Sequence, residues 1–140
     1  MPRKPARPPA PVTPSPTAPC PCGLDASYGA CCGAFHRGSG SAPTAERLMR
    51  SRYSAFVARD AAYLLRTWAA ATRPAAVDFD PGLRWTGLEI LASTGGSAFH
   101  TEATVEFRAH YRVGGRAGEQ RENSRFGRED GGWVYVGEAG

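Results

Sequence analysis

The sequence predicts an α+β domain preceded by a small cluster of cysteines. Apolar residues recur at helical spacing between residues 44 and 68, and after Pro81 the apolar period changes to two. Glycine-rich turn signals then separate successive strands in the second half of the chain. Two helices followed by four antiparallel strands are typical of a domain in which helices pack on one face of a curved sheet.

The first helix is expected to begin after Thr44, a good N-cap, with Glu46 in the first turn. Asp60 is the expected cap of a shorter second helix, which ends near Pro74 because the residue before a proline avoids helical backbone angles. The apolar stripe of the first helix comprises Leu48, Met49, Tyr53, Phe56 and Val57.

Four strands are expected, and residues 99–112 show the clearest alternation. Gly87 marks an expected bulge in the first strand, and Gly114-Gly115 is a hairpin turn signal. One face of the clearest strand is apolar, whereas His110 and its neighbours form a polar face expected to contact solvent. The remaining strands are expected at 85–91, 120–128 and 133–136.

Residues 1–19 form a separate segment with eight of the twelve prolines and no aromatic residue. Such a segment buries too little apolar surface to offset its ordering entropy, which predicts a disordered or polyproline-like tail. A docking peptide for a proline-reading domain is the functional alternative.

The tail also carries three of the seventeen basic residues and none of the thirteen acidic ones. The rest of the chain is therefore nearly neutral, which argues against a nucleic-acid partner. There is no run of 18 apolar residues and no apolar segment after the early basic residues. We therefore expect no membrane span, no signal peptide and a cytoplasmic location, and the sequence sets no oligomeric state.

All four cysteines of the chain lie within thirteen residues, as Cys20-Pro21-Cys22 and Cys31-Cys32. Clustered thiolates suit the tetrahedral preference of Zn²⁺. Four protein ligands would leave no position for a water molecule, so the expected metal is structural. His36 lies just beyond the cluster and is expected to lie near the ligands or in solvent.

Two alternatives to a metal site stay open. Disulfides are disfavoured by a reducing compartment, and adjacent cysteines such as Cys31 and Cys32 cannot easily bridge one another. A redox-active pair is disfavoured because the Cys-X-X-Cys spacing is missing.

Several segments make the sequence similar to known bacterial proteins. The run Cys20-Pro21-Cys22-Gly23, with Tyr28 and Cys31-Cys32-Gly33, resembles the SEC-C zinc-binding motif named from the SecA translocase. Residues 48–56 (LMRSRYSAF), 64–68 (LLRTW), 85–88 (WTGL) and 124–126 (SRF) resemble signatures of the YchJ-like, UPF0225 family.

The resemblance implies an NTF2-like cone, in which a curved antiparallel sheet wraps over helices. It divides the chain into the tail at 1–19, a SEC-C-like zinc knuckle at 20–37 and an NTF2-like domain at 43–137. Ala69-Ala70 stands where family members often carry His-Pro, and the second SEC-C motif of some relatives is absent. The family supplies no reaction.

The SEC-C motif of SecA binds the chaperone SecB, so the resemblance implies that the knuckle docks a protein partner. The expected docking surface consists of residues that flank the ligands: Leu24, Asp25, Phe35 and Arg37. Phe35 has no evident core to enter, but it could instead pack the knuckle onto the domain. A non-enzymatic docking protein is therefore the preferred function.

The alternative function uses the pocket that an NTF2-like cone encloses. Arg52, Glu122 and Ser124 are the candidate pocket residues, and Glu122 near Arg52 would form either a structural ion pair or a ligand contact. An enclosed polar pocket above about 300 Å³ would favour this small-ligand or enzymatic role. We identify no catalytic residues, because no nucleophile arrangement or phosphate loop is present.

Overall fold

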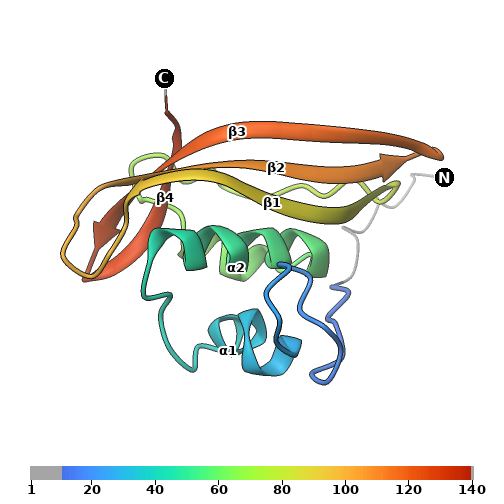
Figure 1. Cartoon of the computed structure of the whole chain (residues 1–140), viewed down its shortest axis with the longest axis horizontal. Helices are drawn as coiled ribbons and strands as arrows, with labels where there is room; N and C mark the ends of the chain where they lie inside the picture. Colours follow the sequence, from blue (N-terminus) through green and yellow to red (C-terminus); the bar gives the residue numbers. More distant parts are fainter. Residues whose placement is uncertain (1–10, 140) are drawn as a thin grey trace, which may run out of the picture.

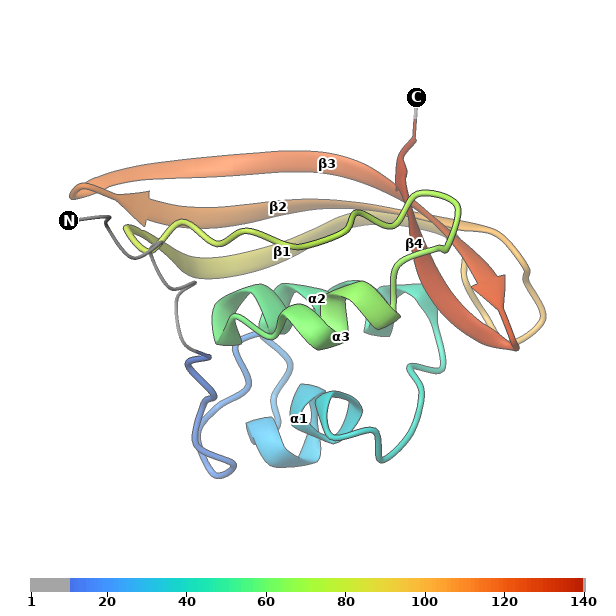
Figure 2. The same cartoon turned by 180° about the vertical axis from the view of Figure 1, so that it is seen from behind.

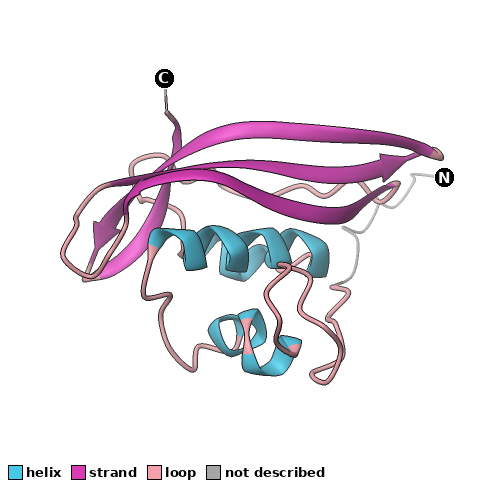
Figure 3. Cartoon of the chain, viewed as in Figure 1, coloured by secondary structure: helices cyan, strands magenta, loops and turns pink. Residues whose placement is uncertain are grey.

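The computed structural model describes residues 11–139 and shows three layers (Figures 1 and 2). A four-stranded sheet forms one layer, helices α2 and α3 lie against it, and the cysteine knuckle with α1 lies on the other side of α2. Figure 3 separates helices from strands. The elements are η1 Tyr28–Ala30, α1 Cys32–His36, α2 Ala45–Ala58, α3 Ala61–Arg66, β1 Leu83–Gly95, β2 Ala103–Val113, β3 Arg116–Glu129 and β4 Gly132–Glu138.

The sheet has the order β1-β2-β3-β4, and every pair is antiparallel, which confirms the expected meander. Gly114 and Gly115 connect β2 to β3 with φ angles of 56° and 79°, the left-handed region that this two-residue turn requires. The register of β1 against β2 shifts between Trp85 and Gly87, where the bulge was expected. The sheet curves toward the helices (Figure 1).

Three of the four strands are longer than the apolar alternation predicts, whereas β2 is shorter and begins at Ala103 instead of residue 99. The β2–β3 hairpin extends beyond the helical layer (Figure 1), and its tip from Val113 to Ala117 is exposed. Side chains there contact solvent on both faces, so no burial pattern marks the ends of these strands in the sequence.

Helix α2 is capped as expected, since Thr44 Oγ1 accepts a hydrogen bond from Arg47 N at 3.1 Å. Asp60 caps α3 in the same way by accepting from Tyr63 N at 3.0 Å. Helix α2 is covered by the sheet on one side and by the cysteine knuckle on the other. Leu48, Met49 and Tyr53 belong to the core between helix and sheet, together with Ala42, Ala45, Ala103, Val105, Phe107, Ala109, Phe126 and Trp133.

The segment before the cysteines differs in part from the predicted tail. Residues 1–10 lie outside the described residues. From residue 11 onward the chain contacts the rest of the molecule: Val12 N donates to Ala58 O at 2.8 Å, and Pro19 pairs with Ser27. A proline residue keeps its carbonyl acceptor, and Gly29 N donates to Pro16 O at 2.9 Å. Backbone hydrogen bonds therefore hold this segment, although it buries little apolar side-chain surface. Among the described residues, no helix is long and apolar enough to cross a membrane.

Candidate functional site

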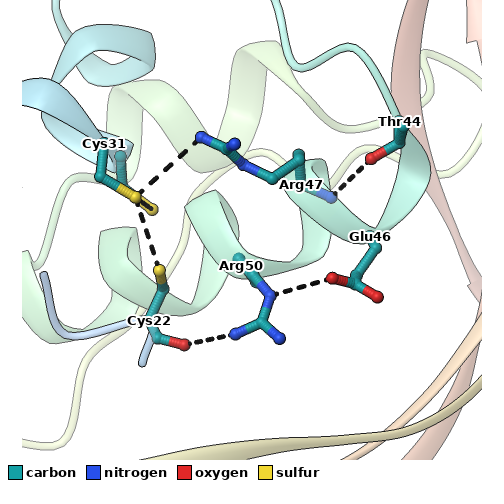
Figure 4. Close-up of polar contacts among 7 residues, drawn as sticks. Cys22, Cys31, Thr44, Glu46, Arg47 and Arg50 are labelled. Atoms are coloured by element: carbon teal, nitrogen blue, oxygen red, sulfur yellow. Dashed lines mark hydrogen bonds and ion pairs between the residues drawn. The ribbon is translucent and has the colours of Figure 1, made fainter. Parts of the chain in front are cut away.

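The four cysteine sulfur atoms lie within 4.8 Å of one another, and all four side chains are buried. Cys22 Sγ lies 3.7 Å from Cys31 Sγ (Figure 4). Cys31 Sγ lies 4.0 Å from Cys32 Sγ. A zinc–sulfur bond of about 2.3 Å gives a tetrahedron with edges of about 3.8 Å. The spacing of the sulfur atoms therefore fits a tetrathiolate zinc site.

Local backbone geometry brings the two cysteine pairs together. Cys20 N donates to Ala26 O at 2.9 Å and closes the first loop, and Cys31 N donates to Tyr28 O at 3.1 Å at the end of η1. Gly33 must be glycine, because a Cβ atom there would lie 2.6 Å from Tyr28 O. The glycine lets the first turn of α1, which begins at Cys32, pack closely against Tyr28.

The chemistry of the cluster also favours a cation over a disulfide. All four cysteines are free, and the sulfur separations are well above the bond length of about 2.05 Å. Thiols that neighbour one another cannot all ionise. The Cys22 thiol lowers the pKa of Cys20, while contact with Cys20 raises the pKa of Cys22 to about 11 and that of Cys32 as well. A bound dication would stabilise the thiolates together.

Two arginines of α2 hold the knuckle (Figure 4). Arg50 Nη1 donates to Cys22 O at 2.7 Å, while Arg50 Nε forms an ion pair with Glu46 at 3.1 Å. Arg47 Nη2 lies 4.0 Å from Cys31 Sγ. The i, i+3 spacing of these arginines places both on one face of α2, but no local pattern in the sequence marks them as contacts of the knuckle.

His36 links the knuckle to the helical layer and is not part of the sulfur cluster. Its Nδ1 lies 2.6 Å from Tyr28 Oη, and its Nε2 lies 2.9 Å from Ser51 O. Burial raises the pKa of Tyr28 to about 12 and lowers the pKa of His36. A neutral His36 thus donates from Nε2 to Ser51 O and accepts at Nδ1 from the Tyr28 hydroxyl.

The four predicted docking residues do not form one exposed surface. Asp25 and Arg37 are exposed, and Leu24 is half-buried against the cysteines. Phe35 is half-buried and packs against both apolar clusters of the domain, with the Arg47 guanidinium carbon 5.3 Å from the centre of its ring. The structure therefore gives Phe35 the packing role, which the sequence left as the alternative to exposure.

The three predicted pocket residues do line one cavity. It has a volume of about 240 Å³, which is below the roughly 300 Å³ set as the criterion, and lies between α2 and the concave face of the sheet. Half of its lining residues are aromatic, and the lining comprises Met49, Arg52, Tyr53, Phe56, Trp68, Trp85, Phe107, Ala109, Gln120, Glu122, Ser124 and Tyr135.

Arg52 is the buried cation of this cavity, with 4% of its surface exposed. Its Nη1 donates to Leu64 O at 2.8 Å and to Thr67 Oγ1 at 2.7 Å. Its guanidinium carbon lies 5.0 Å from the ring centre of Trp68 and 4.8 Å from that of Tyr135. Burial lowers the pKa of Arg52 to about 10, so the group stays charged at neutral pH.

Glu122 is the anion of the same cavity. Its Oε2 accepts hydrogen bonds from Ser124 Oγ and, at 3.2 Å, from Tyr135 Oη. Burial, followed by the charge of Glu122, raises the pKa of Tyr135 to about 12, which keeps this phenol a donor. Among the described residues no ion pair joins Glu122 to Arg52, so the predicted structural ion pair is not formed.

The outer face of the sheet carries the polar residues that the sequence assigned to solvent. His110 Nε2 lies 2.5 Å from Glu89 Oε1, and Arg108 Nε lies 3.1 Å from Glu119 Oε2. These pairs are solvent-accessible and contribute little to stability individually.

The chain resembles proteins of one bacterial family along most of its length. A family model described as the YchJ middle, NTF2-like domain matches residues 44–138. A UPF0225 protein of Streptomyces coelicolor is 64% identical over 121 residues, which cover 86% of this chain and 94% of that protein. A UPF0225 protein of Ralstonia nicotianae is 50% identical over 135 residues, which cover 88% of this chain and 92% of that protein.

Two solved structures share the fold. The solution structure of a SEC-C motif containing protein from Rhodopseudomonas palustris has a TM-score of 0.74 and 32% identity, and the match covers 86% of this chain and 98% of that one. The crystal structure of a SEC-C motif containing protein from Psychrobacter arcticus has a TM-score of 0.72 and 27% identity, with 86% and 81% covered. These matches confirm the resemblance read from the sequence.

Proposed function

Because the chain belongs to the YchJ-like, UPF0225 family, we propose that it is a zinc protein whose SEC-C-like knuckle holds one structural Zn²⁺. The ligands are Cys20, Cys22, Cys31 and Cys32. The observation that carries this proposal is the spacing of the four buried sulfur atoms, all within 4.8 Å of one another. The four thiolates would fill the coordination sphere of the zinc, so no position remains for water or substrate and the metal has no catalytic role.

The zinc organises a surface for a protein partner in the cytoplasm, without enzymatic activity. Asp25 and Arg37 are exposed beside the ligand loop, and Arg37 Nη2 donates to Gly29 O at 3.2 Å, which orients its side chain. Exposed arginines are frequent carriers of interface energy. Leu24, which precedes Asp25 in the chain, adds a half-buried apolar side chain that packs against the cysteines. Phe35 packs against the apolar clusters of the domain and so joins the knuckle to it.

Zinc content tests the metal site, and partner binding tests the docking surface. Cys22→Ser should lower the zinc content from about one per chain, while the matched variant Ser27→Ala, whose side chain makes no cap hydrogen bond, should keep it. The double variant Asp25→Ala/Arg37→Ala should keep zinc and fold and lose capture of the cell-extract partner retained by the wild-type protein. Full zinc in Cys22→Ser would refute the metal site, and normal capture by the double variant would refute the docking surface.

Small-ligand binding in the sheet cavity is a second candidate function. One observation favours it: Arg52 and Glu122 lie in one cavity, half of whose lining residues are aromatic, without forming an ion pair with each other. Binding pockets commonly combine apolar walls with a few polar groups of this kind.

A further inference from the structure

The cavity under the sheet contains two opposite charges with unused hydrogen-bonding capacity. Arg52 makes both of its hydrogen bonds through Nη1, and among the described residues Nε and Nη2 have no partner. A guanidinium has five donors, so these two nitrogens keep donors that the protein itself does not use. This side chain therefore offers donors to an anionic or carbonyl oxygen in the cavity.

Trp68 contributes its aromatic ring to the same wall. Its indole Nε1 is buried and has no hydrogen-bond partner among residues 11–139, while its ring stacks against the Arg52 guanidinium at 5.0 Å. Buried polar groups without partners are rare in native proteins. The Arg52 nitrogens without a protein partner are therefore the groups that can donate to a ligand oxygen at this end of the cavity.

Glu122 offers the complementary function. Both of its hydrogen bonds, from Ser124 and Tyr135, go to Oε2, which leaves Oε1 without a partner among the described residues. These two donors also hold the carboxylate in a fixed orientation. A cationic group of a ligand could donate a hydrogen bond to Oε1 and so pair with the carboxylate.

We propose that this cavity binds a small zwitterion with an apolar body, such as an apolar α-amino acid. The ligand carboxylate binds Arg52, the ammonium group binds Glu122, and the body packs on the aromatic walls. A ligand with one charge alone would meet a like charge in the cavity, whereas a zwitterion matches both side chains. This inference rests on the proposed ligand-binding function of the cavity and names its ligand class.

The size and access of the cavity agree with such a ligand. About 240 Å³ is less than the pockets of drug-sized molecules, which restricts the ligand to about the size of a single amino acid. Gln120 lines the cavity and is solvent-exposed, so the cavity is accessible at that residue.

Three probes with the same ring separate the contributions of the two charges. L-Phenylalanine carries both groups, 3-phenylpropionate carries the carboxylate alone, and phenethylamine carries the ammonium alone. Titration calorimetry and tryptophan fluorescence with the full chain should show L-phenylalanine binding about tenfold or more tightly than either single-charge probe. L-Leucine extends the test to an aliphatic body.

Glu122→Gln removes the anion and keeps an amide oxygen for the hydroxyls of Ser124 and Tyr135. It should weaken L-phenylalanine about tenfold and leave 3-phenylpropionate unchanged or tighter. The matched control Glu119→Gln lies on the same strand, pairs with Arg108 on the outer face, and should change neither affinity. Arg52→Lys, checked for folding by circular dichroism, should weaken both carboxylate probes.

The outcomes distinguish the ligand class from the cavity function. Equal affinity for 3-phenylpropionate and L-phenylalanine would overturn the zwitterion and leave small-ligand binding intact. Failure of all four probes to bind at about 10 mM would overturn both the zwitterionic ligand and the ligand-binding function of the cavity.

Discussion

At the residue scale, His36 shows how a titratable group can be fixed by its surroundings. The imidazole lies between the Tyr28 hydroxyl and the Ser51 carbonyl, and its ring centre is 4.6 Å from that of Tyr63. A neutral ring satisfies both contacts, because one nitrogen donates and the other accepts. A second proton would turn Nδ1 into a donor opposite the Tyr28 hydroxyl, in surroundings that disfavour charge.

The lowered pKa of His36 makes stability depend on pH. In the unfolded chain the imidazole binds a proton near its ordinary pKa of about 6.5, and the folded protein resists that proton. The contribution of His36 is therefore complete above about pH 6.5 and is lost as the pH falls below it. In urea titrations with added zinc at about pH 7.5 and pH 5.5, His36→Gln should lose less stability on acidification than the wild type.

The exposed His100 provides the control for this experiment. His100→Gln should keep the wild-type pH dependence, and zinc release in acid affects all three proteins alike. An unchanged pH dependence in His36→Gln would contradict the assignment of a buried neutral imidazole.

Several residue placements could be predicted, and others could not. The cysteine ligands follow from their spacing, and Ser124 and Glu122 reach the concave face because alternation along the strand places them beside buried Phe126. The hydrogen bonds of Arg50 to Cys22 and of Arg66 to α1 carbonyls depend on how distant elements pack. Local sequence patterns contain no such long-range information.

At the element scale, α1 makes several of the contacts between the knuckle and the domain. Helix α1 is only five residues long and has no helical periodicity to detect in the sequence, so only the structure identifies it. Phe35 packs from it against the core cluster of α2 and against the cluster around Leu64. Arg66 from α3 donates to Phe35 O and His36 O, both at 3.0 Å.

Phe35→Ala should accordingly destabilise the protein. Removing a half-buried aromatic side chain that joins two clusters should lower the free energy of unfolding by about 2 kcal/mol, below the range for a fully buried phenylalanine. Chemical denaturation monitored by circular dichroism measures the change. Phe99→Ala is the matched control, since Phe99 is 95% exposed and its removal should change stability by less than about 0.5 kcal/mol. Equal stabilities of the two variants would contradict the packing role of Phe35.

At the scale of the whole molecule, α2 lies between the sheet and the knuckle (Figures 1 and 2). The sequence from Thr44 to Val136 has its own apolar faces and no cysteine, which predicts that this domain stays folded and only the knuckle loosens when zinc is chelated. The structure couples them, because Ser51 and Ser54 are buried on α2, where Ser51 O contacts His36 and Ser54 Oγ lies 3.8 Å from Cys20 Sγ.

Zinc removal should therefore weaken the domain as well as the knuckle. We expect a chelator to lower the Tm of the wild-type protein by about 5 °C or more, while the sheet core keeps the domain folded at room temperature. Near-UV circular dichroism during thermal melting follows the tryptophans of the domain. The Cys22→Ser/Cys31→Ser variant should not respond to the chelator. A wild-type Tm that does not change would show that knuckle and domain are energetically independent.

X-ray absorption at the zinc edge tests the central assignment most directly. Protein purified without added metal should contain zinc surrounded by four sulfur atoms at about 2.3 Å, as expected for four cysteine thiolates. A coordination shell that contains nitrogen or oxygen ligands, or protein without zinc after expression in zinc-replete medium, would contradict the tetrathiolate site formed by Cys20, Cys22, Cys31 and Cys32.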